Sequence, residues 1–349
     1  MMRSMAVRSY ARRCLMSPVV VCLAGAAWPA MAQDIEAFYR NKTMTVIVGY
    51  PPAGANDVYA RLVSQHIGKY IPGNPTVIIK NMPGAGSMIA ANYLFSNAPK
   101  DGTVLGLLVP TLPLEEALGA AAARYKSAAF NWIGRMAPAP NITFIMNTSQ
   151  VKTIQDAFTK VAILGATGSS ATNAIYPSVL NNVVGTKFNI VQGYKGSAET
   201  ILAMERGEVE GHSSTFDTLK SVRPDWVKNK TVNIVVQYML KRHPELPDVP
   251  TSSELARNDE ERAILRAVSS AAEIGKFILT TPDVPADRVA ALRKAFDAMT
   301  KDPAYIEDAE KQRVELAPLS GDELQKIVVE IGAMPAAIVE KVKAVYPLN

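Results

Sequence analysis

Four short apolar runs recur along the chain, and each is followed by a loop of small residues and then by an amphipathic segment. The first run, Val46-Ile47-Val48, leads into the loop of residues 49–56, and apolar side chains recur every three to four residues from Asp57 onwards. This change of period predicts a strand, a loop and a helix. The other runs lie at residues 77–79, 161–164 and 188–191. The chain is therefore expected to contain four βα units.

The order of these units predicts an α/β fold. Strands that alternate with helices form mainly parallel sheets flanked by helices, and their loops lie at the carboxyl ends of the strands, where open α/β sheets bind ligands. Apolar runs predict further strands at residues 104–109, 142–146, 232–236 and 277–279. The last part of the chain is predicted to be helical, with a capping box from Ser320 to Glu323 and a helix break at Pro335.

The first 32 residues have the pattern of a secretory signal peptide. Four arginines and no acidic residue accompany the apolar stretch of residues 15–28, and Ala30-Met31-Ala32 forms a small-residue cleavage site. The apolar stretch is shorter than the ~20 residues that a membrane-spanning helix needs. We therefore expect export to the periplasm, with cleavage near Ala32, by the general or the twin-arginine route.

Setting this segment aside changes both the charge and the cysteine count. Four of the 37 basic residues precede residue 33, which leaves 33 basic residues against 32 acidic ones. Both cysteines, Cys14 and Cys22, also lie there, so neither a disulfide nor a cysteine-bound metal is expected in the exported chain. A nearly neutral protein lacks the basic surface typical of nucleic-acid binding, and we expect no nucleic-acid partner.

The loops indicate an anion site rather than a catalytic centre. Each loop leaves backbone N–H groups at a helix N-terminus, which attracts negative charge. Residues 84–89 start like a dinucleotide fingerprint but end in Ile89 where close packing needs glycine, and neither a P-loop nor a G-x-S-x-G motif occurs. The three histidines, His66, His212 and His243, have no partner at metal-ligand spacing. The sequence therefore predicts a binding protein without catalytic residues, cofactor or metal.

Two interpretations are open for the polar residues at the helix starts. Asp57 can be the N-cap of its helix, or it can position the loop or bind a ligand ammonium or hydroxyl group. Capping is the more common role for an aspartate in this place, and Ser87, Ser170 and Ser197 allow the same interpretation. The functional signal is therefore the recurrence of such helix starts and not one side chain.

Several motifs, in the same order and at similar spacing, resemble one family from about residue 42 to the end. Residues 48–57 resemble the first βα loop of the Bug-type receptors, the periplasmic solute-binding subunits of tripartite tricarboxylate transporters. Similar motifs follow as N-M-P-G-A-G at 81–86, P-K-D-G at 99–102, Y-K-G-S at 194–197 and L-P-D-V-P-T at 246–251. The combination carries the resemblance, because each motif alone is weak.

The resemblance implies a two-lobed, type II periplasmic-binding-protein fold of the Venus-flytrap kind. It assigns residues 33–137 and 255–349 to a discontinuous first lobe and residues 138–254 to the second. A monomeric receptor is implied, which holds a small organic carboxylate between its lobes and delivers it to a membrane permease. The residues assigned to ligand binding are Tyr50, Pro52, Ala53, Gly54, Asn56, Asp57, Ala85, Gly86, Ser87, Thr167, Gly168, Ser169, Ser170, Ala171, Thr172, Tyr194, Gly196, Ser214 and Asp217.

Departures from the family pattern leave the ligand open. Ala53 and Ser87 stand where the family usually has glycine, the loop of residues 167–172 is unusually rich in serine and threonine, and residues 211–217 differ from the common version. Two alternatives to a transport receptor are an exported α/β hydrolase and a ligand-sensing receptor without a transport role. The size and charge of the ligand, and the permease that is served, are not defined by these motifs.

Overall fold

The computed structural model describes residues 35–52, 54–168 and 171–346. The predicted signal peptide (1–32), its cleavage site near Ala32, and the loop residues Ala53, Ser169 and Ser170 lie outside the described residues. Within the described part, no helix is both long and apolar enough to cross a membrane.

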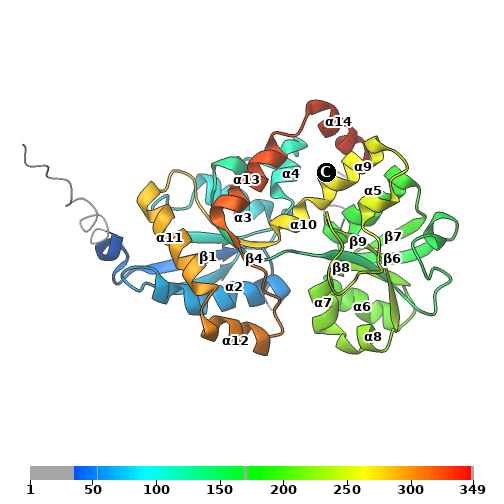
Figure 1. Cartoon of the computed structure of the whole chain (residues 1–349), viewed down its shortest axis with the longest axis horizontal. Helices are drawn as coiled ribbons and strands as arrows, with labels where there is room; N and C mark the ends of the chain where they lie inside the picture. Colours follow the sequence, from blue (N-terminus) through cyan, green and yellow to red (C-terminus); the bar gives the residue numbers. More distant parts are fainter. Residues whose placement is uncertain (1–34, 53, 169–170, 347–349) are drawn as a thin grey trace, which may run out of the picture.

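A six-stranded sheet forms the centre of the first lobe (Figure 1). Its strands are β1 (Thr43–Val48), β2 (Thr76–Asn81), β3 (Val104–Leu107), β4 (Asn131–Ala137), β10 (Lys276–Thr280) and β11 (Leu319–Ser320). The strand order is β11-β4-β10-β3-β1-β2. β1 pairs in parallel with β2 and β3, whereas β10 is antiparallel to β3 and β4, and β11 is antiparallel to β4.

A five-stranded sheet forms the centre of the second lobe. Its strands are β5 (Asn141–Met146), β6 (Ala162–Ala166), β7 (Phe188–Gln192), β8 (Gly211–Thr215) and β9 (Val232–Tyr238). The order is β7-β6-β8-β5-β9, with β6 parallel to β7 and β8, and β5 antiparallel to β8 and β9. The four predicted βα units are confirmed, and their strands are β1, β2, β6 and β7.

The expectation of mainly parallel sheets is wrong, because both sheets are mixed. The antiparallel pairs involve the strands through which the chain passes between the lobes: β4 leads into β5, and β10 brings the chain back to the first sheet. A strand that arrives from the other lobe needs no helical crossover within its own sheet. It can therefore lie antiparallel to its neighbours, unlike the strands of a βαβ unit.

Helices pack around the first sheet with the apolar faces that their periodicity predicts. They are α2 (Ala55–His66), α3 (Met88–Ser96), α4 (Leu112–Ala117), α11 (Ala286–Met299), α12 (Pro303–Lys311) and α13 (Gly321–Gly332). α2 packs on β1 and β2 with Tyr59, Leu62 and Val63 buried, and α11 packs on β4 with Leu292 and Phe296 buried. The predicted capping box at the start of α13 is also confirmed.

The helices of the second lobe show that the expected return to the first lobe at residue 255 is too early. They are α5 (Thr172–Val184), α6 (Ser197–Glu205), α7 (Phe216–Val222), α8 (Pro224–Lys228) and α9 (Asp259–Ser269). α9 packs on α5 of the second lobe, and its buried side chains include Ile264, Leu265 and Val268. The chain rejoins the first sheet only at β10.

The C-terminal helix α14 (Ala336–Val345) also departs from the expected lobe assignment. It packs on α9 and α5 and lies next to them at the top of Figure 1. Asn182 Nδ2 on α5 donates to Val345 O at 2.9 Å, and Lys341 pairs with Glu260 on α9 at 2.7 Å. The chain thus passes between the lobes at residues 138–140, through α10 (Ala271–Ile274), and again between α13 and α14.

Candidate functional site

A cavity of about 800 Å³ lies between the two lobes and is lined by residues of both. The first lobe contributes the β1–α2 and β2–α3 loops, and the second contributes the β6–α5 and β7–α6 loops and the end of β8. The structure therefore brings the four predicted loops to one place. The volume falls in the range of pockets that bind small organic molecules.

Besides α3, three helices begin at this cavity without a side-chain cap. The N-cap residues of α2, α5 and α6 are Gly54, Ala171 and Gly196, all three line the cavity, and none makes a side-chain hydrogen bond to its helix. The first N–H groups of a helix have no partner within the helix, and the helix dipole favours an anion there. The starts of α2, α5 and α6 thus offer backbone donors from both lobes to a single space.

Some helix starts that lie away from the cavity carry a side-chain cap. Asn258, Asp302 and Ser320 cap α9, α12 and α13 by accepting a hydrogen bond from a first-turn N–H group. None of these three residues lines the cavity. At the cavity itself α7 is capped, by Thr215. Missing caps are not confined to the cleft, because α4, α8, α10, α11 and α14 also begin without one. What α2, α5 and α6 share is that their uncapped starts come together at one interlobe cavity.

Asp57 is not the N-cap that the sequence favoured. α2 begins directly after Gly54, so Asp57 lies in its first turn. The Asp57 carboxylate accepts hydrogen bonds from Asn81 Nδ2 at 2.9 Å and from Arg61 Nε at 2.8 Å, and Asn81 Nδ2 also donates to Tyr50 O at 3.0 Å. The side chain ties the end of β2 to the first loop. Its role is to position that loop, and it does not line the cavity.

Ser87 also makes no cap, and instead joins the two loops of the first lobe. Its Oγ donates to Gly49 O at 2.9 Å, and a Cβ on Gly49 would collide with the Ser87 side chain. Ser87 has a φ of 71°, and Ala85 in the same loop has a φ of 43°. Such values are uncommon for residues other than glycine, which explains why the family pattern has glycine where this chain has Ser87.

The loops of the second lobe are held by local hydrogen bonds. Asn173 Oδ1 accepts from Thr167 N at 3.1 Å and from Thr167 Oγ1 at 3.2 Å, and both residues line the cavity. Gly196 is extended, and a Cβ added to it would have no atom within 4 Å. Tyr194 packs beneath the loop, against Gly165 and the apolar core of this lobe. The predicted contact of Tyr194 with a ligand therefore has no support from its position.

Ser197 and His212 form a hydrogen-bonded pair at the cavity with the composition of a nucleophile and its base. His212 Nδ1 lies 2.8 Å from Gly165 O, and Nε2 lies 3.0 Å from Ser197 Oγ. A carbonyl oxygen only accepts, so Nδ1 carries the hydrogen and Ser197 donates to Nε2. Burial lowers the pKa of His212 to about 4, which makes the ring a weak base. The ring is oriented by a carbonyl group and not by the carboxylate of a triad, so the pair is a fixed hydrogen bond.

A buried ion pair joins the lobes at the cavity. Lys276 Nζ at the start of β10 contacts Asp217 Oδ2 in the first turn of α7, and the two side chains are 2% and 7% exposed. The Lys276 ammonium also lies 4.8 Å from the centre of the Tyr59 ring, and Tyr59 OH donates to Glu315 O at 2.9 Å. Burial, and secondly the Asp217 carboxylate, raise the pKa of Tyr59. The Tyr59 hydroxyl is therefore neutral, and its hydrogen is already donated to Glu315 O.

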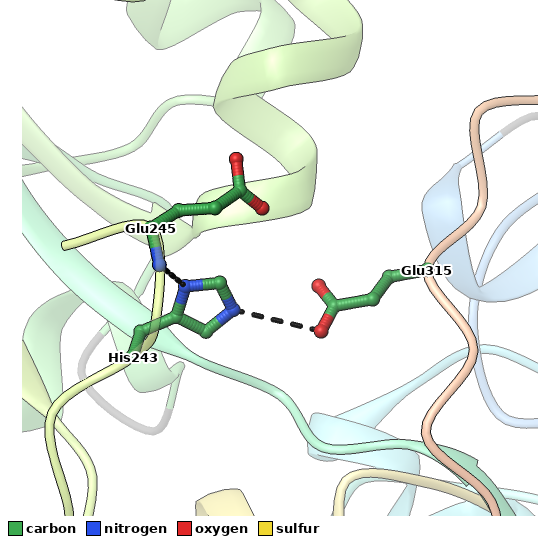
Figure 2. Close-up of side chains that lie close together, drawn as sticks. All are labelled: His243, Glu245 and Glu315. Atoms are coloured by element: carbon green, nitrogen blue, oxygen red, sulfur yellow. Dashed lines mark hydrogen bonds and ion pairs between the residues drawn. The ribbon is translucent and has the colours of Figure 1, made fainter.

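A second contact between the lobes joins His243 to Glu315 (Figure 2). His243 Nε2 lies 3.5 Å from Glu315 Oε1, and His243 Nδ1 accepts the Glu245 N–H at 3.2 Å. Together with Glu245, these side chains place three possible metal ligands within 4.8 Å of one another, which the sequence did not predict. Because Nδ1 already faces a donor, a neutral ring keeps its hydrogen on Nε2, directed at Glu315. The group fits a contact between the lobes better than a metal site.

The structure places most of the predicted ligand-binding residues on the cavity. The lining residues among them are Tyr50, Pro52, Gly54, Asn56, Gly86, Ser87, Thr167, Ala171, Thr172, Gly196, Ser214 and Asp217. The predicted residues that are described but do not line it are Asp57, Ala85, Gly168 and Tyr194. Contact with a ligand stays a prediction for each lining residue, and Ala53, Ser169 and Ser170 lie outside the described residues.

The structure also adds charged residues that the sequence did not assign to the site. Lys195, Lys276 and Arg313 line the cavity, and Asp217 is the acidic residue among the described lining residues. Lys276 could have been noticed in the sequence, because it directly precedes the apolar run of residues 277–279. The three cations outnumber the one acidic residue among these side chains, and together with the positive ends of the helix dipoles they favour an anionic ligand.

Comparison with known proteins agrees with this geometry. The family model for the tripartite tricarboxylate transporter family receptor (TctC) matches residues 59–343. The periplasmic binding protein BugD has the same fold, with a TM-score of 0.64 at 19% identity over 88% of this chain and 99% of BugD. Rpa4515 of R. palustris with adipate gives 0.65 at 19% identity over 88% of this chain and 99% of that one. MatC of Rhodopseudomonas palustris with bound malate gives 0.63 at 20% identity over 85% and 99%. The chain belongs to the tripartite tricarboxylate transporter receptors, a family of solute-binding proteins and not of enzymes.

Proposed function

We propose that this protein is a periplasmic receptor that captures a small organic carboxylate between its lobes and delivers it, as a monomer, to a tripartite tricarboxylate-type membrane permease. The observation that carries the proposal is that α2, α5 and α6 begin without side-chain caps at one interlobe cavity. Donors of this kind match a carboxylate, which accepts several hydrogen bonds and carries the negative charge that helix dipoles favour.

Binding proceeds by capture and closure. The carboxylate accepts N–H bonds from one lobe, and the other lobe then closes over it, which requires a higher affinity for the closed form than for the open form. Hydrogen bonds to a charged group contribute about 1.5–3 kcal/mol each. Three to five such bonds supply the ~8 kcal/mol of a micromolar complex. The Lys276–Asp217 and His243–Glu315 contacts join the two lobes, so they favour the closed form.

Two related structures support the ligand class without defining the ligand. MatC holds malate and Rpa4515 holds adipate. These dicarboxylates differ in length and in the presence of a hydroxyl group. In this chain a second carboxylate would meet Lys195 or Arg313, whose side chains line the cavity and are exposed.

Isothermal titration calorimetry with a panel of mono-, di- and tricarboxylates tests the proposal. The protein is first unfolded and refolded, and native mass spectrometry verifies that its cleft is empty. We expect at least one carboxylate to bind with a micromolar or lower Kd, and its neutral amide analogue to bind at least 100-fold more weakly. Failure of every carboxylate, or equal binding of the amide, would refute the proposal.

A further inference from the structure

The C-terminal helix α14 belongs to a third connection between the lobes, beside the two that form the hinge. Those two connections, residues 138–140 and α10, lie side by side, because Ala139 N donates to Ala272 O at 2.9 Å. The third, residues 333–335, leads from α13 to α14, and α14 lies at the upper edge of the molecule in Figure 1, away from α10. Two adjacent connections allow the lobes to rotate about them, whereas a third segment that spans both lobes elsewhere restrains this rotation.

The helix before this connection is fixed to the first lobe. α13 packs on β4 and α4, and its buried side chains include Leu324, Val328 and Ile331. The capping box at Ser320 holds its first turn. α13 therefore moves with the first lobe as one body.

The helix after the connection is fixed to the second lobe. α14 packs on α9 and α5, and Val342 at its centre is fully buried. Ile338 and Val345 lie on either side of Val342 in the sequence and pack against the same core. The bond from Asn182 to Val345 and the ion pair of Lys341 with Glu260 add polar contacts to this apolar face. α14 therefore moves with the second lobe.

The residue that follows α14 is buried between groups of both lobes. Tyr346 is 5% exposed and belongs to the core. Burial, then the carboxylate of Glu115 on α4, then Tyr176 on α5 raise the pKa of Tyr346. The end of α14 is thus close to charged and polar groups of each lobe.

The connection between α13 and α14 has little slack. Three residues extend to about 11 Å at most, and this segment is not extended, because Met334 N donates to Ile331 O at 3.3 Å and Ile338 N donates to Pro335 O at 2.9 Å. A large separation of the lobes at this edge would require either these bonds to break or α14 to leave the second lobe.

We propose that α14 is a strap that holds the lobes together along the upper edge of the molecule and confines their opening to the lower edge, where α12 and α8 lie in Figure 1. α7, whose Asp217 pairs with Lys276 of the first sheet, also lies at the lower end of the second lobe, so this pair and α14 hold different edges. This inference goes beyond the proposed function and does not depend on the ligand. A strap of this kind shortens the movement to the closed form, so a ligand needs less differential affinity to close the lobes.

Distances between spin labels on the two lobes test the inference in the exported chain without ligand. The sequence after residue 32 contains no cysteine, so introduced cysteines are labelled uniquely. Glu330→Cys on α13 with Arg266→Cys on α9 reports on the upper edge, and Glu310→Cys on α12 with Lys228→Cys on α8 reports on the lower edge. All four positions are exposed. Double electron–electron resonance should give a narrow distance distribution at the upper edge and a broader one at the lower edge.

Two variants release the strap by different routes. Five Gly/Ser residues inserted after Ala333 add about 17 Å of reach while α13 and α14 keep their own packing, and Val342→Asp detaches α14 because it would bury an unpaired charge. Both should lengthen and broaden the upper-edge distance. The same insertion after Gly207, in the exposed turn between α6 and β8 within the second lobe, is the matched control and should leave it unchanged.

Each outcome supports the strap or removes it. An upper-edge distance that stays the same in either folded variant, an equal change in the Gly207 insertion, or a broader distribution at the upper than at the lower edge of the unmodified protein would overturn the inference. Circular dichroism establishes that the variants are folded, and if Val342→Asp is not, the insertion and its control decide alone.

Discussion

The substitution Gly54→Val tests the role of the α2 start in isolation. Gly54 has φ −89° and ψ 168°, a conformation that valine adopts readily, and the nearest atom to an added Cβ is Pro51 O at 4.0 Å. The fold should therefore accept the side chain. Gly54 is the N-cap of α2 and lines the cavity, so the isopropyl group would stand in front of the first N–H groups of the helix.

The magnitude follows from the hydrogen bonds that the side chain would block. Loss of one bond between a backbone N–H group and the carboxylate costs about 1.5–3 kcal/mol, which is about 10- to 150-fold in Kd. Calorimetry measures the affinity, and a thermal melt shows whether the fold is intact. Gly168→Val is the matched control: Gly168 lies in another of the four predicted loops, but it does not line the cavity, and its Cβ would meet no atom within 4 Å. Unchanged affinity in Gly54→Val, or an equal loss in Gly168→Val, would refute the reasoning.

Three further predictions concern contacts between the lobes, at the connection between them, and within the second lobe. Lys276→Met leaves Asp217 buried without its cation and should lower the free energy of unfolding by about 3–5 kcal/mol in urea titrations; a loss below about 1 kcal/mol would contradict the buried pair. Gly275→Ala places a Cβ against Ala137 O at a φ of 61° and should cost at least about 1–3 kcal/mol, whereas Gly332→Ala, with open space around it, should not destabilise the protein. Burial lowers the pKa of His212 to about 4 in the folded protein, below its unfolded value. The contribution of His212 to the free energy of unfolding is therefore complete above pH 6.5, and about 3 kcal/mol of stability is lost as the pH falls towards 4. Urea titrations at several pH values should show that His212→Gln lacks this component of the pH dependence.

The strands of the fold were visible in the sequence only where they are apolar. β1, β2, β6 and β7 are marked by short apolar runs before small-residue loops. The central strand β8, Gly-His-Ser-Ser-Thr, was missed because its residues are polar, although most of them are buried through hydrogen bonds such as that of Ser213 with Thr143. Hydropathy carries no signal for a strand that is buried by polar contacts.

The site was predictable in outline and not in its side-chain pairs. The recurrence of helix starts after small-residue loops could be predicted from the order of strands, loops and helices, but the absence of side-chain caps at these starts could not. The pair of Asp217 and Lys276 could not, because the two residues are 59 positions apart and meet only when the lobes face each other. The sequence favours a cap at Asp57 because capping is the common role of an aspartate at a helix start. The helix begins earlier, however, and the Asp57 carboxylate accepts hydrogen bonds from Asn81 and Arg61 instead.

The lobe assignment failed for a related reason. α9 and α14 have ordinary amphipathic patterns, and a pattern of this kind does not say which surface will cover the apolar face. Their partner is α5, which lies far away in the sequence. The resemblance alone therefore assigned them to the first lobe.

The central claim is that a carboxylate is held between the lobes by backbone N–H groups at helix starts. A crystal structure of the protein with its tightest-binding carboxylate tests this most directly. The account predicts carboxylate oxygens within about 3 Å of N–H groups at the start of α2 in one lobe and of α5 or α6 in the other. A carboxylate bound by the side chains of Lys195 and Arg313 alone, with no ligand atom at these helix starts, would contradict it.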